Sequence, residues 1–275
     1  MSKTPKAKKT GAVRVDGKRK IKLSQISPDA TGAYREKEET LERLDALRAR
    51  LIELQEALYA ERRRSVLIVL QAMDTGGKDG ALRRIMSGVN AAGVQVTSFK
   101  APSAEELDHD FLWRAHHRVP GCGMIGVWNR SHYEDVLIVR VHKLAPRKVW
   151  TARYDDINTF EAMLHHNNVT VLKFFLHISK DEQKERLQAR LDDPAKNWKF
   201  SPGDLEERKY WDDYQAAFEA AINRCSTPHA PWIVVPANHK WGRDIAIAEA
   251  VVEALEKLDP QFPKPDFDPA AIVID

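Results

Sequence analysis

The most informative run in the chain is VLIVLQAMDTGGKDG, which spans residues 66–80. Its first part is apolar and rich in β-branched residues, as is typical of a buried strand. A glycine-containing loop follows, and a helical pattern begins at about residue 81. A strand, a glycine loop, a lysine and a helix in this order form an anion cradle, because backbone N–H groups and the helix N-terminus face the ligand. We therefore expect phosphate to bind at Gly76, Gly77, Lys78, Asp79 and Gly80.

This loop departs from the common pattern G-x-x-x-x-G-K-[ST] in two places. Ala72 replaces the first glycine, and Asp79 replaces the Ser or Thr that usually binds Mg²⁺. The loop also contains a carboxylate, Asp74, although an acid in an anion-binding loop is costly unless a cation accompanies it. We interpret Asp74 as a residue that binds a metal ion or handles a proton. The alternative is an ordinary turn aspartate before two glycines.

The composition narrows the class of protein. The 275 residues are 43% hydrophobic and 30% charged, enough for one large α/β domain or two small ones. No apolar run approaches the ~20 residues of a membrane span, and the basic N-terminus lacks the apolar segment of a signal peptide. The two cysteines, Cys122 and Cys225, are far apart, which argues against a disulfide scaffold or a zinc site. We expect a cytoplasmic protein with no membrane partner.

Positive charge is concentrated at the N-terminus. Residues 1–20 contain eight Lys or Arg residues and one acid, Asp16, and they lack apolar periodicity. We expect this basic tail to be flexible. It could bind a polyanion through charge alone or have no partner, and the sequence favours neither reading.

Apolar patterns predict alternating strands and helices through the rest of the chain. Strands are expected at residues 65–71, 94–99, 122–128, 169–178 and 231–236. Long helices are expected at residues 36–62, 103–117, 150–166, 180–192, 204–224 and 243–258. This alternation predicts an α/β fold, with a parallel sheet covered on both faces by helices and with functional residues at the carboxyl ends of the strands.

Polar residues follow the first three expected strands. The glycine loop follows the first, Lys100 follows the second, and Asn129 and Arg130 follow the third. In P-loop enzymes this third position usually supplies an Asp that holds Mg²⁺, so an asparagine there requires another carboxylate. We expect Asp74 to be the metal ligand, with Glu134 as the second candidate.

A cation-rich segment lies at residues 185–200, where Pro194 interrupts the chain. Arg186 and Arg190 are four residues apart and therefore share a helix face. Beside a phosphate loop, two arginines on a mobile element suit a lid that stabilises a transferring phosphoryl group. An exposed helix with ordinary ion pairs is the alternative reading.

Several motifs of this sequence together resemble the polyphosphate kinase type 2 family. They are QAMDTGGKDG (71–80), TSFKAPS (97–103), NRSHYEDV (129–136), KERLQARLD with WK (184–192 and 198–199) and VPANHKW (235–241). The resemblance covers about residues 35–270 and implies a P-loop kinase-like three-layer α/β/α fold with a helical lid. With the basic tail at residues 1–20, it implies a single P-loop phosphotransferase domain at residues 21–275, with the lid at about 181–210.

The resemblance also implies an activity. Family members transfer phosphoryl groups reversibly between inorganic polyphosphate and nucleotides, with Mg²⁺ as cofactor and Mn²⁺ as a substitute. The wording YEDV at residues 133–136 resembles the class III branch, which converts AMP to ADP and ADP to ATP. We expect adenine nucleotides as partners, with guanine nucleotides as a further class, and a homo-oligomer, either a dimer or a tetramer. No specific nucleic-acid partner is expected.

The matched motifs imply roles for single residues. The implied catalytic residues are Asp74, Lys78, Arg130, Arg186 and Arg190. Polyphosphate is expected to lie, beyond the glycine loop itself, along Arg83, Lys100, Arg118 and Arg130. The nucleotide is expected at Asp74, Asn129, Glu134, Trp198 and Lys199, with its base near the tryptophan. The family motif often reads Asp-Arg-Ser where this chain has Asn129, so this position departs from the pattern.

Two other functions stay open. An ATP-dependent nucleotide or nucleoside kinase would share the fold, although Asp74 and Asp79 in the loop count against it. A polyanion- or nucleic-acid-binding protein would use the basic tail and the lid. It would bind less tightly as salt rises and would show no turnover.

Overall fold

The computed structural model describes residues 9–274, so the first eight residues of the expected basic tail lie outside the described part. Within it, one sheet has the strand order β1-β6-β5-β2-β4-β3. The strands are β1 (Val13–Val15), β2 (Ser65–Ala72), β3 (Val94–Ser98), β4 (Ile125–Asn129), β5 (Val169–His177) and β6 (Trp232–Pro236). All neighbouring strands are parallel except β1, which runs antiparallel to β6.

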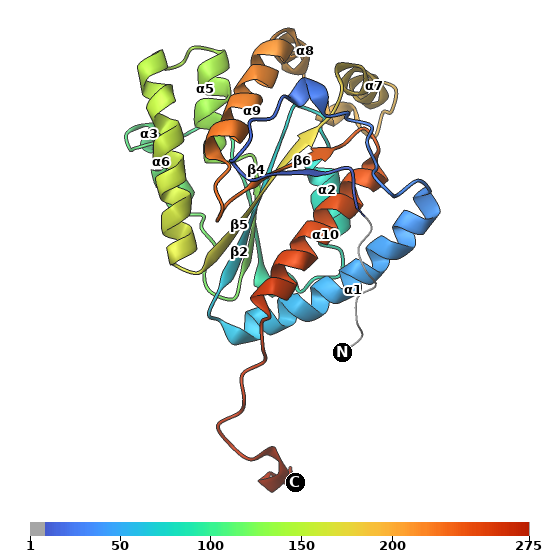
Figure 1. Ribbon diagram of the computed structural model, residues 1–275, viewed down its shortest axis with the longest axis vertical. Helices are drawn as coiled ribbons and strands as arrows, with labels where there is room; N and C mark the ends of the chain where they lie inside the picture. The colour runs from blue at the N-terminus through green and yellow to red at the C-terminus, as the bar shows by residue number, and fades with distance from the viewer. Residues whose placement is uncertain (1–8, 275) are drawn as a thin grey trace.

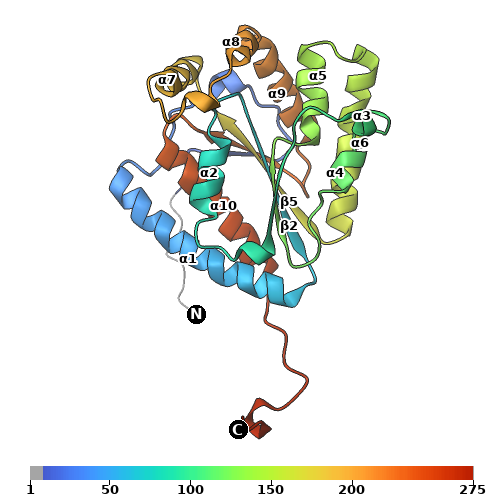
Figure 2. The ribbon, with the colours of Figure 1, turned by 180° about the vertical axis from the view of Figure 1, so that it is seen from behind.

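Helices cover both faces of this sheet (Figures 1 and 2). One face carries α1 (Lys37–Glu61), α2 (Lys78–Ile85) and α10 (Lys240–Leu258). The other carries α3 (Ala104–Leu107), α4 (Trp113–His116), α5 (Ile138–Val141), α6 (Arg147–His166) and α9 (Trp211–Cys225). Near the carboxyl ends of the strands lie α7 (Lys180–Leu191) and α8 (Pro202–Lys209).

Burial explains the arrangement. Every residue of the central strand β2 is buried, as expected for a parallel strand with helices on both sides. On α1, leucines at spacings of three and four form the buried stripe, including Leu44, Leu47, Leu51 and Leu58. No helix in residues 9–274 is long and apolar enough to cross a membrane.

The α/β fold expected from the sequence is confirmed, but the expected mobile tail is wrong for Val13–Val15. These residues pair with β6, and Val15 is buried. A strand of three residues is too short to show a period in the sequence, so only its pairing reveals it. The sheet was expected to be parallel, but it is mixed, because β1 is antiparallel to β6.

Three predicted boundaries are also corrected. The strand expected at 122–128 begins at Ile125, because Gly123 makes a turn with φ +88°. The helix expected at 103–117 is divided into α3 and α4, and the Asp110 side chain accepts a hydrogen bond from the Leu112 N–H at the break. The helix expected at 204–224 is divided into α8 and α9 at Tyr210.

Candidate active site

The glycine loop (residues 73–77) connects β2 to α2 at the carboxyl edge of the sheet. Gly77 has φ +94°, and a Cβ at this position would clash with the guanidinium of Arg243. That guanidinium is itself buried and held by the carboxylate of Asp244, at 2.6 and 2.8 Å. A glycine is therefore required here both by the backbone angle and by the close approach of an arginine.

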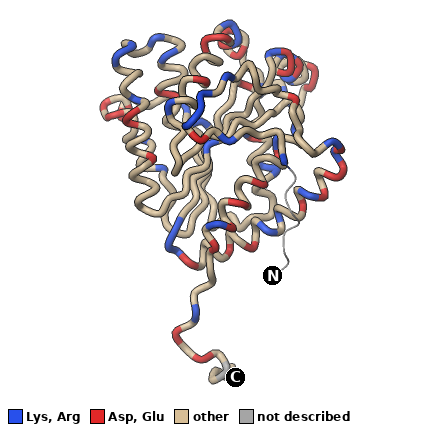
Figure 3. Tube along the Cα trace, in the orientation of Figure 1, with Lys and Arg blue, Asp and Glu red and all other residues tan. Residues whose placement is uncertain are grey.

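A groove of about 480 Å³ runs along the loop, and we call it the loop groove. Gly76, Gly77, Asp79, Gly80 and Asn129 lie on its wall. Its cationic lining residues are Lys78, Arg83, Arg130, Arg186, Arg190, Lys196, Lys199, Lys240 and Arg243. Along the trace as a whole, charges of both signs are interspersed (Figure 3), so this excess of cations is a local feature that suits a polyanion.

A second hollow of about 220 Å³ adjoins the groove, and we call it the acidic cavity. Its charged lining residues are Asp74, Arg130, Glu134, Asp204 and Glu207. The rest of its wall is largely apolar and includes Met73, Leu137, Ile138 and Phe218. Asp74, Arg130 and Asp204 line both spaces, so these three residues form the boundary between the groove and the cavity.

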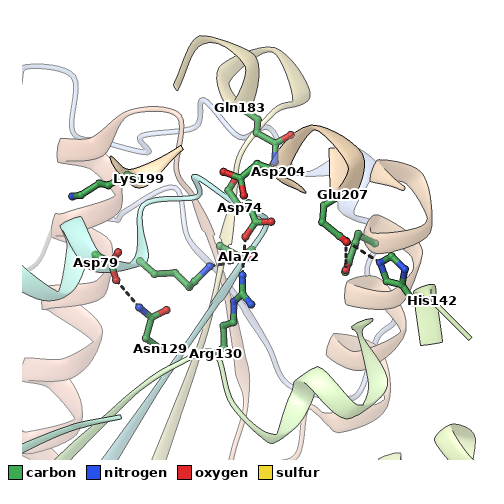
Figure 4. A network of polar contacts seen from close by, with 12 residues as sticks. Ala72, Asp74, Asp79, Asn129, Arg130, His142, Gln183, Lys199, Asp204 and Glu207 are labelled. Carbon is green, nitrogen blue, oxygen red and sulfur yellow. Dashed lines mark hydrogen bonds and ion pairs between the residues drawn. The ribbon is translucent and has the colours of Figure 1, made fainter. Parts of the chain in front are cut away.

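The boundary is held by direct contacts (Figure 4). The Arg130 guanidinium donates to Asp74 Oδ1 at 2.9 Å, and the Gln183 amide donates to the Asp74 carbonyl at 3.0 Å. Arg130 has φ +61°, which is uncommon for a residue other than glycine and turns its side chain back from the end of β4. Lys78 Nζ donates to the Ala72 carbonyl at 3.3 Å. The Asn129 amide is 2.5 Å from Asp79 Oδ1.

Two carboxylates of the acidic cavity, Glu134 and Asp204, are not fully balanced by neighbouring positive charges. Burial raises the pKa of Glu134, and Asp74 adds to this effect although Arg130 and Lys78 oppose it. Burial also raises the pKa of Asp204, again with a contribution from Asp74. A cation placed among these carboxylates would lower both pKa values. Among residues 9–274 no group of three or more His, Cys, Asp or Glu side chains is placed to hold a metal ion, so a divalent ion here would be held by one or two carboxylates together with phosphate oxygens.

Arg186 of α7 lies on the loop groove but is largely engaged by the protein itself. Its Nη1 donates to the Thr75 carbonyl at 3.1 Å, and its Nη2 donates to the carbonyls of Ala237 and Asn238 at 2.6 and 3.1 Å. Its Nε donates to Glu182 at 2.6 Å. Arg186 thus fastens α7 to the glycine loop and to the end of β6.

Arg190 connects the outer part of the same region. Its Nη1 donates to the Lys199 carbonyl at 3.0 Å and to Asp204 Oδ2 at 3.3 Å. It thereby joins α7 to the 3₁₀ turn Asn197–Lys199 and to α8. Movement of residues 181–210 as a lid stays a prediction.

Three of the expected residues line neither the loop groove nor the acidic cavity. Lys100 and Arg118 line a separate hollow of about 410 Å³ beyond β3. Trp198 is 78% exposed, lines none of the three hollows, and donates its indole N–H to the Ala195 carbonyl. The remaining expected residues line the loop groove, the acidic cavity or both.

The sequence analysis missed several lining residues. In the loop groove these are Lys196, Lys240 and Arg243, and in the acidic cavity they are Asp204 and Glu207. Lys240 follows the last strand, so the rule that functional residues gather at strand ends could have found it. No comparable signal marks the two acids, because each stands among other charges on a short surface helix.

A buried polar network anchors the segment that carries Arg130 and Glu134. The Tyr133 hydroxyl donates to Glu161 at 2.9 Å and accepts from Lys173 Nζ at 2.9 Å. Lys173 Nζ also lies 2.5 Å from Glu161 and 2.6 Å from the Cys225 carbonyl. Both Lys173 and Glu161 are fully buried. Burial opposes ionisation of Glu161, but Lys173 and His132 outweigh it and lower the pKa of this carboxyl.

Neighbouring contacts complete this anchor. The Ser131 hydroxyl accepts from the Gln71 amide at 3.1 Å and from the Tyr133 N–H at 3.2 Å. Residues 131–133 are therefore tied to β2 and to the buried ion pair. Since Arg130 precedes and Glu134 follows this run, the network fixes the position of both side chains relative to Asp74.

The architecture and the site define an α/β protein with an anion-binding glycine loop at the carboxyl edge of its sheet. Comparison with known proteins specifies the family. The family model Polyphosphate kinase 2 (PPK2) matches residues 34–263. The chain therefore belongs to the polyphosphate kinase 2 family, as the motifs indicated.

Individual relatives agree with this assignment. An AMP/ADP-polyphosphate phosphotransferase from Meiothermus ruber is 52% identical over 96% of this chain and 98% of its own length. An ADP-polyphosphate phosphotransferase from Rhodopseudomonas palustris is 45% identical over 93% of each chain. The crystal structure of polyphosphate kinase 2 from Arthrobacter aurescens TC1 superposes with a TM-score of 0.91 at 48% identity, covering 94% of this chain and 92% of that one.

Proposed function

We propose that this protein transfers phosphoryl groups between inorganic polyphosphate and adenine nucleotides, converting AMP to ADP and ADP to ATP reversibly. The observation that carries the proposal is the boundary of Asp74, Arg130 and Asp204, where a cation-rich groove meets an acid-rich cavity. The name of the Meiothermus ruber relative supports polyphosphate with AMP and ADP, and that of the Rhodopseudomonas palustris relative supports polyphosphate with ADP.

The two spaces suit different parts of the reactants. The loop groove offers cations to the repeated negative charges of polyphosphate and to the nucleotide phosphates. The acidic cavity would repel phosphate, but its carboxylates can accept hydrogen bonds from ribose hydroxyls and base amino groups. We therefore assign the donor to the groove and the nucleoside to the cavity, with the acceptor phosphate at their boundary.

The reaction follows from this placement. An oxygen of the nucleotide phosphate forms a bond to the terminal phosphorus of the donor, and the bridging oxygen leaves with the shortened chain. Lys78 and Arg130 lie where charge develops on the transferring group, so they stabilise it electrostatically. Bound Mg²⁺, or Mn²⁺ in its place, would neutralise phosphate charge there, with Asp74 as its first candidate ligand and Glu134 as its second.

The proposal also covers the location of the enzyme, its further acceptors, its assembly and its lid. A cytoplasmic location is supported by two free cysteines, Cys122 and Cys225, with no disulfide between them. Guanine nucleotides as further acceptors and a dimer or tetramer as the assembly follow from the family resemblance. The helical segment 181–210 would close over the boundary as a lid, since Gln183 and Asp204 already lie beside Asp74 (Figure 4).

One assay tests the function. Purified protein is incubated with AMP or ADP, long-chain polyphosphate and Mg²⁺, without ATP, and nucleotides are separated by chromatography. Formation of ADP or ATP is expected. An ATP-dependent kinase would produce nothing until ATP is added, and a binding protein would produce nothing in either case. Asp74→Asn serves as the inactive control.

A further inference from the structure

The chain continues past α10 as an extended segment, and we call residues 261–275 the C-terminal arm. The root of this arm is fixed, because Pro260 is buried and Arg64 donates to the Leu258 carbonyl. Beyond the root, residues 261–269 and 271–274 are all exposed. Figures 1 and 2 show the arm directed away from the helices and the sheet. The arm therefore projects from the fold at a fixed point.

The composition of the arm suits docking on another surface. Its large apolar side chains are all exposed, and they are Phe262, Phe267, Ile272, Val273 and Ile274. Three Asp and one Lys give the arm a negative charge. Three prolines in the arm keep it extended and stiff, which reduces the entropy that is lost when it binds. An exposed segment of this kind fits a surface that offers both apolar groups and cations.

A hollow of about 730 Å³ between α5 and α6 offers such a surface, and we call it the α5–α6 hollow. Its cations are Arg140, Lys143 and Arg147, and its apolar lining includes Leu144 and Trp150. Lys143 has φ +54°, which is uncommon for a residue other than glycine, and Leu144 directly after it is 68% exposed. The hollow thus presents an apolar side chain to the outside among three positive charges.

Two of the lining side chains are held in place by the protein. The Arg140 guanidinium donates to the Tyr154 hydroxyl at 3.3 Å and lies 5.1 Å from the centroid of the Trp150 ring. A cation stacked on an aromatic ring is a rigid arrangement, so this wall of the hollow is formed before any partner binds.

The sign of its charge distinguishes the α5–α6 hollow from the other two cationic hollows. The loop groove also contains Asp74, Asp79 and Asp204, and the hollow beyond β3 contains Glu106. The residues of the described chain that line the α5–α6 hollow include no Asp or Glu. An acidic segment therefore meets carboxylates in the first two hollows but only cations in the third.

The arm and the α5–α6 hollow lie at opposite edges of the sheet within one molecule. α6 ends shortly before β5 begins, so its first residue, Arg147, lies at the carboxyl edge. α10 begins after the carboxyl end of β6 and runs back to Leu258, so the arm leaves from the amino edge and points outward (Figure 1). This placement favours the hollow of a second copy over the arm's own.

We propose that the C-terminal arm of one copy docks in the α5–α6 hollow of a second copy. Phe267 packs against Leu144 and Trp150, and Asp266 faces Arg147. An exchange of both arms between two copies closes the assembly as a dimer. The family model ends at residue 263, so most of the arm lies beyond the part that defines the family. The inference does not depend on the proposed function, because neither surface belongs to the loop groove or the acidic cavity.

The test is disulfide crosslinking between two different variants of the full chain. Both carry Cys122→Ser, because Cys122 is exposed. Phe267→Cys is mixed with Leu144→Cys and oxidised with copper phenanthroline, and the products are separated by non-reducing gel electrophoresis. The new thiols are on separate chains, so a disulfide between them can join only two copies. Docking should give a covalent dimer in about tenfold higher yield than either variant alone, because it raises the effective concentration of the two thiols.

The matched control is Leu107→Cys, because Leu107 is 69% exposed but lies on α3, outside the α5–α6 hollow. Mixed with Phe267→Cys, it should give no more covalent dimer than either variant alone. Exchanging charges gives a second measure. Asp266→Lys in the arm variant should lower the yield with Leu144→Cys about fivefold, and Arg147→Glu in the hollow variant should restore it. Circular dichroism and thermal melting establish that all variants are folded.

Three results would overturn the inference. They are the absence of a covalent dimer from the mixture, equal yields with Leu144→Cys and Leu107→Cys, and a yield that the charge exchange does not restore. Since crosslinking needs no substrate, these results are independent of whether the protein transfers phosphoryl groups.

Discussion

The loop groove and the acidic cavity share a wall but differ in charge. Nine of the residues lining the groove are Lys or Arg, whereas the cavity has four carboxylates and only Arg130 as a cation. An anion is attracted to the first space and repelled by the second, so the two reactants can approach the same point without exchanging places. We expect the difference in charge on the two sides of Asp74 to direct the donor to the groove and the nucleoside to the cavity.

The largest effects are expected at Asp74, in the wall that the two spaces share, and at Lys78, on the groove side of that wall. Asp74→Asn and Lys78→Ala should each lower kcat by about 10²–10³-fold, because each removes a charge that acts on the transferring group. Steady-state rates with polyphosphate and ADP measure the effect, and thermal melting monitors folding. A folded Asp74→Asn protein with wild-type turnover would contradict the assigned role.

A second substitution tests the buried polar network of Tyr133, Lys173 and Glu161, which anchors the segment that carries Arg130 and Glu134. Tyr133→Phe leaves Lys173 and Glu161 each without one buried hydrogen-bond partner, so it should cost about 1–3 kcal/mol in the free energy of unfolding. Because Tyr133 lies between Arg130 and Glu134, kcat should fall while KM for polyphosphate changes little. Urea unfolding and steady-state kinetics give the two quantities. A loss of stability with unchanged kcat would make the network purely structural.

The pH profile tests the charge on the groove side. Burial lowers the pKa of Lys78, and the neighbouring charge of Arg130 lowers it further. A lysine with a lowered pKa loses its proton at a lower pH than usual, so kcat/KM should begin to fall earlier on the alkaline side, by up to about tenfold per pH unit. In Lys78→Arg the guanidinium stays charged. That variant should be slower but lack this alkaline decline, and a retained decline would assign it to another group.

A matched pair of milder substitutions sharpens the contrast between the spaces. Glu207→Gln, in the acidic cavity, should raise KM for the nucleotide about fivefold and leave KM for polyphosphate unchanged. Lys240→Ala, on the groove, should do the reverse to a similar extent. Two-substrate initial-rate kinetics separate the effects. If each variant altered both KM values equally, donor and acceptor would not occupy separate spaces.

The smallest effect is expected at Trp198. Its indole is exposed and outside the groove and the cavity, so Trp198→Ala should change KM for the nucleotide by less than about twofold. Fluorescence of the wild-type protein should likewise respond little to nucleotide. A large rise in KM would show that the segment 181–210 brings the tryptophan to the base when substrates bind.

The sequence predicted the parts of the fold and the site that are formed by residues close together in the chain. The run from Val66 to Gly80 predicted a strand, a loop and a helix, and the structure has β2, the glycine loop and α2 in that order. The residues at strand ends could also be predicted, because parallel strands share a carboxyl edge. The expected site residues Asp74, Lys78, Asn129 and Arg130 accordingly line one groove.

The rest depended on long-range packing. Asp204 and Glu207 enter the acidic cavity only because α8 folds back over the glycine loop, and no local pattern announces this. Lys100 was expected in the same groove as Lys78, but β4 separates β3 from β2 and places it in a hollow of its own. The buried pair of Lys173 and Glu161 was missed since each lies in an otherwise ordinary strand or helix.

The contacts of Arg186 limit how far α7 can move relative to the glycine loop. Four of its donor bonds are already made, three to main-chain carbonyls of the glycine loop and of the segment after β6 and one to Glu182. Lifting the whole of α7 would break them together, and the outer stretch is also held, because Arg190 donates to the Lys199 carbonyl and to Asp204. We therefore expect any closure of the proposed lid to leave the contacts of Arg186 in place, so that the floor of the phosphate site keeps its shape.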